Sequence, residues 1–213
     1  RFSSALLLLI PVLGLAACAR GPEMVPQPLD GALAKHPLDL SEVRHFVMDN
    51  GLKVLLVSDP RFNKSATAMY VGVGTLSNPK ERMGLAHFLE HMLFMGSTRY
   101  PGEAELEEFL SKHGGYRNAF TDYEKTCYYL EVNKAELHQA LDMFAQLFTE
   151  PLLKTESAER ELSAIDSEFR LAQNDDSTRL RQLVASFAKE GHPFRTFGLG
   201  NLKSLKQAHS SCI

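Results

Sequence analysis

The sequence predicts an α+β fold in which a largely antiparallel sheet packs against helices. Two strand-like segments, residues 43–48 and 52–58, flank Asn50-Gly51, and Asn-Gly supplies the positive φ angles that a tight hairpin requires. After residue 84 the apolar side chains change from a strand period to a helical period. Because strands and helices are grouped rather than alternating one by one, we expect few parallel pairings.

The remaining elements follow from the same two periods. Residues 65–73 alternate as a third strand, and two more strands are predicted over residues 116–121 and 125–132. Apolar residues at helical spacing predict helices over residues 84–95, 104–112, 135–148, 155–173 and 177–189. Thr155 is expected to cap the long fourth helix, and Glu156 lies in its first turn, where a negative charge is favourable.

The composition is that of an ordinary globular chain. It has 213 residues, of which 44% are hydrophobic and 23% charged, enough to bury one core. The formal net charge is -3 and Lys and Arg form no run, so we expect no nucleic-acid partner. The 3 cysteines include no CxxC pair and are too few for a disulfide framework.

Residues 1–17 are interpreted as a secretory signal peptide. The apolar run over residues 5–17 follows a basic residue and is too short to span a bilayer as a helix. Its end, Leu15-Ala16-Ala17-Cys18, resembles the bacterial lipobox, which implies cleavage before Cys18 and lipidation of that cysteine. Ala19 favours the outer membrane, so the resemblance implies a lipid-anchored periplasmic protein of a bacterium. The alternative is a plain signal peptide with an incidental cysteine.

The lipid-attachment Cys18 is followed by a predicted spacer. Residues 18–37 are rich in Pro and Gly, which is typical of an extended linker between an anchor and a domain. The folded domain is expected over residues 38–213. Residues 202–213 show no obvious helix end and no sheet-closing strand, so we expect this domain to be truncated.

A His-x-x-Glu-His motif lies on the first predicted helix. His87 and His91 are four residues apart, so both imidazoles project from one helix face and can share a metal ion. Glu90 precedes His91, which places a carboxylate where a general base can take a proton from water. Imidazole ligands and hydrolytic chemistry favour zinc. The competing interpretation is a set of polar residues on a solvated helix face.

A third ligand is expected from the long fourth helix. Glu161 and Glu168 are two turns apart and share one face, whereas Glu159 and Asp166 point elsewhere. Either glutamate could complete a His-His-Glu site that leaves one position open for water. The other could hold a ligating imidazole through its second ring nitrogen. The spacing alone leaves open which glutamate does which.

Further sequence blocks surround the His-x-x-Glu-His helix. Residues 84–97 read GLAHFLEHMLFMGS, and Asn118-Ala119-Phe120-Thr121, residues 161–168 and His192-Pro193-Phe194 follow in order. Together these blocks resemble the N-terminal catalytic domain of the pitrilysin and insulin-degrading-enzyme family, the inverzincin metallopeptidases. The resemblance covers about residues 45–201. It implies a metallopeptidase fold similar to pitrilysin and mitochondrial processing peptidase.

The resemblance also assigns roles residue by residue. It implies one zinc ion per chain and three kinds of site residue: His87, His91 and Glu168 as zinc ligands, Glu90 as general base, and Glu161 as a supporting carboxylate. Asn118, Ala119 and Phe120 would bind the substrate, which joins an edge strand as an added strand. The implied activity is that of an endopeptidase or oligopeptidase acting on peptides and small proteins.

Two other classes remain open. Family members of this type close two halves around the substrate, so a missing C-terminal half or a partner subunit is expected to be needed for full activity. A lipid-anchored, non-catalytic or partner-dependent subunit is therefore the first alternative. A metal-dependent lyase such as S-ribosylhomocysteinase also uses a His-x-x-Glu-His helix. It fits less well, because it lacks an export signal and the Glu161 and Glu168 block.

Overall fold

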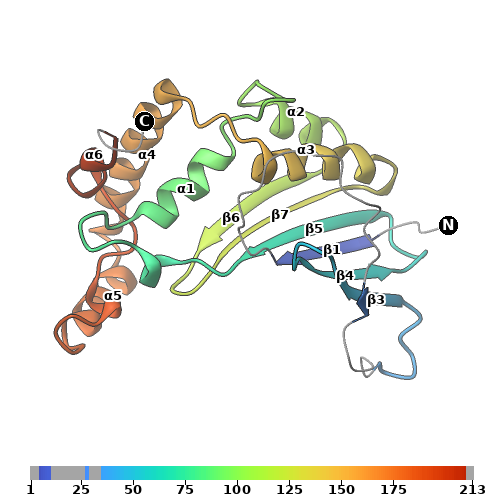
Figure 1. The fold of residues 1–213 in the computed structure, drawn as a ribbon, viewed down its shortest axis with the longest axis horizontal. Coiled ribbons are helices and arrows are strands. Elements are labelled where there is room, and N and C mark those ends of the chain that lie inside the picture. Colours follow the sequence, from blue (N-terminus) through green and yellow to red (C-terminus); the bar gives the residue numbers. More distant parts are fainter. Residues whose placement is uncertain (1–4, 11–26, 29–34, 210–213) are drawn as a thin grey trace. The chain divides into compact units, whose positions relative to one another are not determined.

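The computed structural model describes residues 5–10, 27–28 and 35–209 (Figure 1). They divide into two compact units, each built from several separate stretches of chain. The first unit holds residues up to 72 together with 106–118 and 127–144, and the second holds residues 73–105, 119–126 and 145 onward. The first unit carries most of the sheet, and the second carries the His-x-x-Glu-His helix.

The sheet has the strand order β2-β3-β4-β1-β5-β7-β6 among the described residues. Its strands are β1 (Ala5–Ile10), β2 (Gln27–Pro28), β3 (Glu42–Val47), β4 (Lys53–Ser58), β5 (Lys64–Val71), β6 (Tyr116–Thr121) and β7 (Thr126–Asn133). Strands β1 and β4, β2 and β3, and β3 and β4 pair antiparallel, whereas β1 and β5 pair parallel. The α+β class with a largely antiparallel sheet is confirmed.

The predicted hairpin is present as β3 and β4. Val47 lies opposite Lys53 in the register, and Gly51 takes the positive φ of 83° that the turn requires. Asn50 Oδ1 accepts a hydrogen bond of 3.0 Å from the Leu52 nitrogen. The turn residues therefore set the register, as their sequence indicates.

The core of the first unit lies between the sheet and two helices. Figure 1 shows α2 (Glu105–Lys112) and α3 (Leu137–Thr149) over the same face of the sheet. Alternate residues of β7 face them and are almost fully buried. The buried side chains of this core are Leu106, Leu110, Tyr128, Leu130, Val132, Ala140, Met143 and Phe144. Burial of each large apolar side chain contributes on the order of 1.5–3 kcal/mol.

The second unit is mainly helical. It contains α1 (Leu85–Leu93), α4 (Thr155–Ala172), α5 (Asp176–Ser186), α6 (Leu202–His209) and two short 3₁₀ turns, η1 (Thr75–Ser77) and η3 (Pro193–Arg195). Leu162 and Ile165 of α4 pack against Leu205 of α6, with Phe88 of α1 at the edge of the cluster. This cluster holds α1, α4 and α6 together, and so positions the two helices that carry the predicted ligands.

Two expectations about helix ends are wrong. Thr155 is the first residue of α4 rather than its cap, because Lys154 occupies the cap position and makes no side-chain capping bond. The end of the described chain forms α6, where the sequence shows no obvious element. Asn201 and Ser204 cap α6 reciprocally, since each side chain accepts from the other's backbone nitrogen, at 2.9 and 3.1 Å. A short helix of low hydrophobicity gives a weak periodic signal, whereas this pair of caps is readable in the sequence.

The N-terminal segments are described only in part. Ala5–Ile10, within the predicted signal peptide, forms β1, and Gln27–Pro28, within the predicted linker, forms β2. Cys18 and the predicted cleavage region lie outside the described residues, so the signal peptide and the lipidation stay predictions. Cleavage before Cys18 would remove β1, the strand between β4 and β5.

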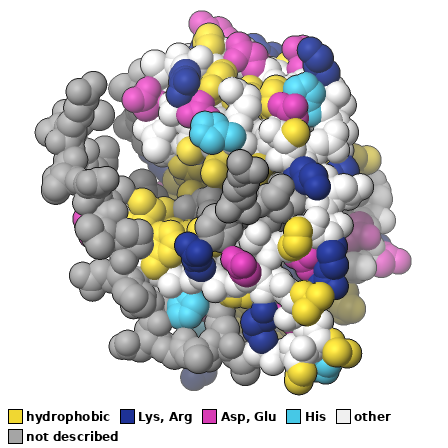
Figure 2. Space-filling view, turned by 90° about the vertical axis from the view of Figure 1, so that its right-hand side faces the viewer, with side chains coloured by type: hydrophobic (Ala, Val, Ile, Leu, Met, Phe, Trp, Pro, Cys, Tyr) yellow, Lys and Arg dark blue, Asp and Glu magenta, His cyan; other side chains and the backbone are white. Residues whose placement is uncertain are grey.

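The surface of the described chain is mixed in charge. On the face seen in Figure 2, Lys and Arg side chains lie among Asp, Glu and hydrophobic side chains rather than in one patch of the described residues. Helix α5 and the residue after it expose large apolar side chains at helical spacing, namely Leu180, Leu183, Val184 and Phe187. No described helix combines the length and the hydrophobicity that crossing a membrane requires.

Candidate metal centre

Helix α1 presents His87 and His91 on one side, one turn apart. Their Nε2 atoms lie 3.3 Å from each other, and the two rings meet edge-on at 83°. Two nitrogens bound to one tetrahedral zinc ion at about 2.0–2.1 Å would lie about 3.3–3.4 Å apart. The separation of the two imidazole nitrogens therefore suits one shared ion.

Helix α4 brings a carboxylate to the same point. Glu168 Oε2 lies 3.5 Å from His87 Nε2, and Glu168 Oε1 lies 3.7 Å from His91 Nε2. One ligand atom from each of these three residues lies within 4.8 Å of the others. Glu161, two turns earlier, contacts the opposite nitrogen of His91, with its Oε2 2.8 Å from Nδ1. The geometry thus separates the two glutamates, which spacing along the helix could not.

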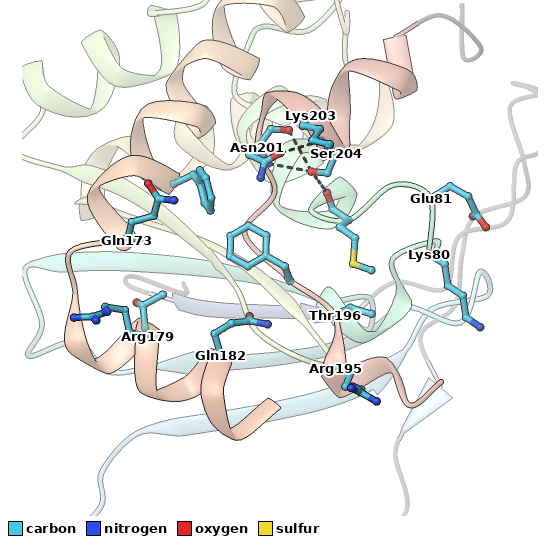
Figure 3. A pocket seen from close by; sticks show the side chains of 15 residues that line it. Lys80, Glu81, Gln173, Arg179, Gln182, Arg195, Thr196, Asn201, Lys203 and Ser204 are labelled. Atoms are coloured by element: carbon cyan, nitrogen blue, oxygen red, sulfur yellow. Dashed lines mark hydrogen bonds between the residues drawn. The ribbon is translucent and has the colours of Figure 1, made fainter. Parts of the chain in front are cut away.

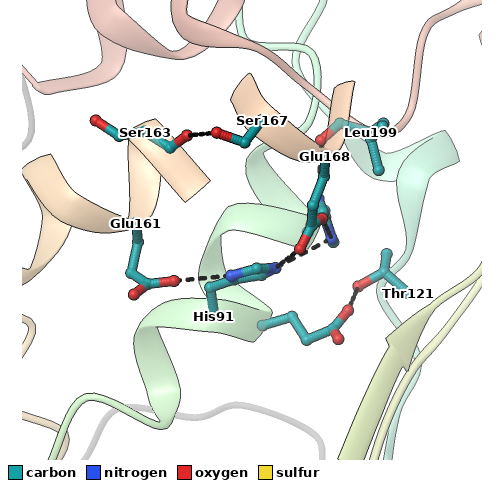
Figure 4. A network of polar contacts seen from close by, with 9 residues as sticks. His91, Thr121, Glu161, Ser163, Ser167, Glu168 and Leu199 are labelled. Carbon is teal, nitrogen blue, oxygen red and sulfur yellow. Dashed lines mark hydrogen bonds and ion pairs between the residues drawn. The ribbon is translucent and has the colours of Figure 1, made fainter. Parts of the chain in front are cut away.

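The partners of the outer ring nitrogens determine the tautomers of both histidines (Figure 4). His87 Nδ1 lies 2.8 Å from the Leu199 carbonyl oxygen, which can only accept, so Nδ1 carries the proton. The Glu161 carboxylate places the proton of His91 on Nδ1 in the same way. Both Nε2 lone pairs then point toward the Glu168 carboxylate with no donor between them. A metal cation satisfies all three acceptors at once, so the residues fit the ion that their types predict.

The carboxylate of Glu90 is buried and anchored on one side. The residue is 8% exposed, and its Oε2 accepts a hydrogen bond of 2.5 Å from Thr121 Oγ1. Thr126 Oγ1 lies 3.3 Å from Thr121 Oγ1 and donates to the Val73 carbonyl oxygen at 2.9 Å. The pair of hydroxyl groups therefore orients Glu90 and leaves Oε1 without a hydrogen-bond partner among the described residues.

Contacts outside the cluster hold α4 in place. Ser157 donates to Glu103 at 2.5 Å, and together with Arg160 it lowers the pKa of Glu103 from its usual value. Further along α4, Asp166 Oδ1 accepts from the Leu202 nitrogen at 3.2 Å, which ties this helix to α6. The segment that carries Glu161 and Glu168 is therefore linked to neighbouring elements at two points.

Two glycines allow the Leu199 carbonyl to reach α1. Gly84 precedes α1 with a φ of 91°, and Gly200 follows Leu199 with a φ of 81°. A Cβ atom on Gly84 would lie 2.3 Å from the Gly200 Cα atom, closer than any side chain tolerates. The two backbones can therefore touch only where neither residue has a side chain, and this contact places Leu199 beside His87.

The predicted substrate-binding residues lie on β6, which is an edge strand of the described sheet. Asn118 and Phe120 are exposed, and Ala119 between them is half-buried. Lys125 Nζ lies 5.9 Å from the centre of the Phe120 ring. An edge strand can accept a peptide as an additional strand, so the position agrees with the predicted mode of binding. The substrate-binding role of these three residues stays a prediction.

Two partners of the cluster escape prediction from the sequence. Thr121 belongs to a recognisable sequence block, but nothing in that block assigns it to Glu90; it lies three residues after Asn118 and faces the other side of β6. Period-two alternation is the signal that indicates its inward direction. The Leu199 carbonyl is a backbone group, so no side-chain pattern identifies it. Its neighbours Gly198 and Gly200 are the only signal in the sequence.

Fold and site together define a class, the metallopeptidases whose helix carries the His-x-x-Glu-His order. The profile of the family Insulinase (Peptidase family M16) matches residues 53–196 of the chain. The chain therefore belongs to the insulinase family, peptidase family M16. The resemblance drawn from the sequence blocks is confirmed.

Individual relatives agree with this family. The chain is similar to the insulin-degrading enzyme of Mus musculus, with 45% identity over 180 residues that cover 84% of this chain and 18% of the relative. Protease 3 of Salmonella typhimurium is 41% identical over 201 residues, or 94% of this chain and 21% of the relative. A nardilysin-like protein of Arabidopsis thaliana is 52% identical over 150 residues, or 70% of this chain and 15% of the relative.

A solved structure shows the same fold. The crystal structure of pitrilysin superposes with a TM-score of 0.82 and 40% sequence identity, covering 88% of this chain and 21% of that chain. The chain thus spans about a fifth of the length of the relatives that it matches.

Proposed function

We propose that this chain is the catalytic domain of a zinc-dependent endopeptidase that hydrolyses peptides and small proteins. One observation carries the proposal: two imidazole lone pairs and a carboxylate, from His87, His91 and Glu168, converge within 4.8 Å with no donor between them. Their outer partners, Leu199 and Glu161, hold the imidazoles with Nε2 facing inward. Membership of a peptidase family supports the same conclusion.

The proposed chemistry divides among three groups. A zinc ion held by the two histidines and Glu168 would supply Lewis acidity, which activates water and polarises a peptide carbonyl. Glu90 takes the proton from the attacking water through Oε1 and passes it to the leaving amine. Thr121 keeps the other carboxylate oxygen in place during both transfers. Asn118, Ala119 and Phe120 on β6 would align the peptide as an added strand.

A second candidate, a partner-dependent or non-catalytic subunit, is less favoured. A subunit without catalysis does not need Glu90 to be buried and anchored beside the proposed metal ligands, and this chain has every polar member of the motif. Because the relatives are about five times longer, we propose that further polypeptide completes the substrate chamber.

The metal content of the purified full chain tests the proposal first. We expect one zinc per wild-type chain by plasma mass spectrometry and a loss of bound zinc in His87→Ala and Glu168→Ala. Glu159→Gln is the matched control, because Glu159 is exposed on the same helix and lies outside the cluster. Glu90→Gln should keep zinc.

Cleavage of a quenched fluorescent peptide is measured on the same samples. Cleavage by the wild-type chain that is lost in Glu90→Gln, with zinc retained, supports the endopeptidase. Zinc binding without cleavage supports the partner-dependent subunit instead. A folded wild-type chain that binds no zinc overturns the metallopeptidase proposal.

Residues 1–18 alone indicate where the protein is located. We propose export to the periplasm of a bacterium and lipid anchoring to the outer membrane through Cys18. Incorporation of a radiolabelled fatty acid by the wild-type chain, and its loss in Cys18→Ala, is the expected result. An unlabelled wild-type chain contradicts the anchor.

A further inference from the structure

The second unit contains a cavity that the proposed peptidase chemistry does not use. Its volume is about 880 Å³, within the range of small-molecule sites. The end of α4, helix α5, the loop after η3 and the start of α6 form its walls (Figure 3). None of the metal-cluster residues, nor Glu90 or Glu161, lines it.

The lining combines apolar side chains with an excess of positive charge. Met83, Phe169 and Phe197 are half-buried, and the two phenyl rings meet edge-on with centroids 5.2 Å apart. Four basic side chains and one acidic side chain complete the charged part of the lining: Lys80, Arg179, Arg195, Lys203 and Glu81. The chain as a whole has a net charge of -3, so this excess of cations is local.

Most of these cations form no ion pair within the described part of the chain. Arg179 is the exception, with an exposed ion pair of 3.0 Å to Asp176. Lys80, Arg195 and Lys203 are exposed and have no such partner among the described residues. Cations around an apolar base attract an anion whose body is apolar, because the body leaves water while the charged end stays at the rim.

We propose that this cavity binds a small organic carboxylate with an aromatic body, such as a free aromatic acid or the carboxyl-terminal residue of a peptide. The ring stacks beside Phe169 and Phe197, where edge-to-face contacts are favourable. The carboxylate lies toward Lys203 and Arg195. Gln182 and Asn201 supply further hydrogen-bonding groups. Such binding requires neither zinc nor peptidase activity.

The position of the cavity determines which variants are informative. Phe169 follows Glu168 in the chain, and Phe197 lies two residues before Leu199. Substituting either phenylalanine would therefore disturb the metal cluster as well. The exposed cations are better targets, because none of them belongs to the cluster.

Ligand-observed fluorine NMR of N-acetyl-4-fluorophenylalanine, titrated with the full chain, tests the proposal. We expect line broadening that gives way on addition of excess unlabelled N-acetyl-phenylalanine. Lys203→Gln and Arg195→Gln should each weaken binding about five-fold, the usual effect of one exposed charge pair. Lys206→Gln is the matched control, because Lys206 is exposed on the same helix but does not line the cavity. It should leave binding unchanged.

Two further probes separate the parts of the ligand. N-acetyl-4-fluorophenylalaninamide, which lacks the charge, should bind more weakly, and acetate should not compete. A tetrapeptide ending in 4-fluorophenylalanine that binds more tightly than the amino acid identifies a peptide end, whereas weaker binding identifies a free acid. Absence of broadening with the wild-type chain, equal binding of the amide, or equal weakening by Lys206→Gln overturns the proposal.

Discussion

Thr121 Oγ1 donates a hydrogen bond of 2.5 Å to Glu90 Oε2, and this bond joins the edge strand β6 to the proposed general base (Figure 4). The neighbouring Thr126 hydroxyl is itself anchored on the Val73 carbonyl oxygen. Glu90 is on α1, beside His91, so its carboxylate needs a partner from outside the helix to hold one rotamer. Thr121 supplies that partner from β6.

Thr121→Val should lower kcat about ten-fold, because it removes a hydrogen bond to a charged group at nearly constant volume. KM and zinc content should stay unchanged, since neither the proposed metal ligands nor the exposed face of β6 is altered. Thr121→Ser should restore most of the rate. Steady-state kinetics with metal analysis checks both variants in whichever form of the protein cleaves peptide.

An equal loss of kcat in the Ser and Val variants would contradict the positioning role of the hydroxyl. Loss of zinc from Thr121→Val would contradict it as well, because the effect would then come from disturbed folding of the cluster.

Glu161→Gln should weaken zinc binding about 10- to 100-fold, the usual effect of removing an outer partner of a ligating histidine. The amide can still accept from His91 Nδ1, but it no longer carries the charge that makes this imidazole a better ligand. Competition with a chelator measures the affinity. Glu159→Gln, exposed elsewhere on α4, should bind zinc like the wild-type chain, and similar losses in the two variants would argue against a specific role of Glu161.

The predictable part of the site is the part written in helical spacing. His87 and His91 share a face of α1, and Glu161 and Glu168 share a face of α4, because both pairs are separated by whole turns. Spacing cannot decide which glutamate faces the Nε2 atoms. That choice depends on how α4 packs on α1 through Phe88, a tertiary contact that no local pattern contains.

The fold is most predictable where turn chemistry is strong. Asn50-Gly51 indicates the hairpin, and the alternating burial of β5 follows the predicted period. Helix α6 is short and weakly periodic, so only its caps, Asn201 and Ser204, mark it in the sequence. The position of β1 in the sheet has no local signal at all, since strand pairing between distant segments depends on tertiary context.

Gly84→Ala should destabilise the chain by about 2–5 kcal/mol and also weaken zinc binding. A side chain at a left-handed φ costs about 1–2 kcal/mol, and overlap with the Gly200 backbone adds a packing penalty of about 1–3 kcal/mol. Moving Gly200 away would also withdraw the Leu199 carbonyl from His87. Denaturant unfolding and chelator competition measure the two effects.

Gly191→Ala is the control for this variant. Gly191 has a φ of 79°, and no other part of the described chain lies within 4 Å of the place that a Cβ atom would take. The variant should show the strain of the left-handed backbone alone, with normal zinc affinity. If Gly84→Ala and Gly191→Ala behave alike, close approach of the two glycine backbones is not what positions Leu199.

Asp59→Asn should destabilise the chain near neutral pH and lose that effect in acid. The Arg61 guanidinium hydrogen-bonds both oxygens of Asp59, at 2.5 to 3.1 Å, and lowers the pKa of Asp59 to about 2. An aspartate in an unfolded chain has a pKa of about 3.9, so the folded state binds the proton less readily. The stabilisation is therefore complete above about pH 4 and disappears as the pH falls through about 2.

Thermal unfolding of the wild-type chain and Asp59→Asn between about pH 2 and pH 7 measures this effect, with melting temperatures that converge toward the acid end. Asp49→Asn is the control, because Asp49 is exposed in the turn between β3 and β4, and it should change stability little at any pH. A difference between wild type and Asp59→Asn that stays constant with pH would mean that the charge of Asp59 is not responsible, since an uncharged carboxyl group would then stabilise the fold equally well.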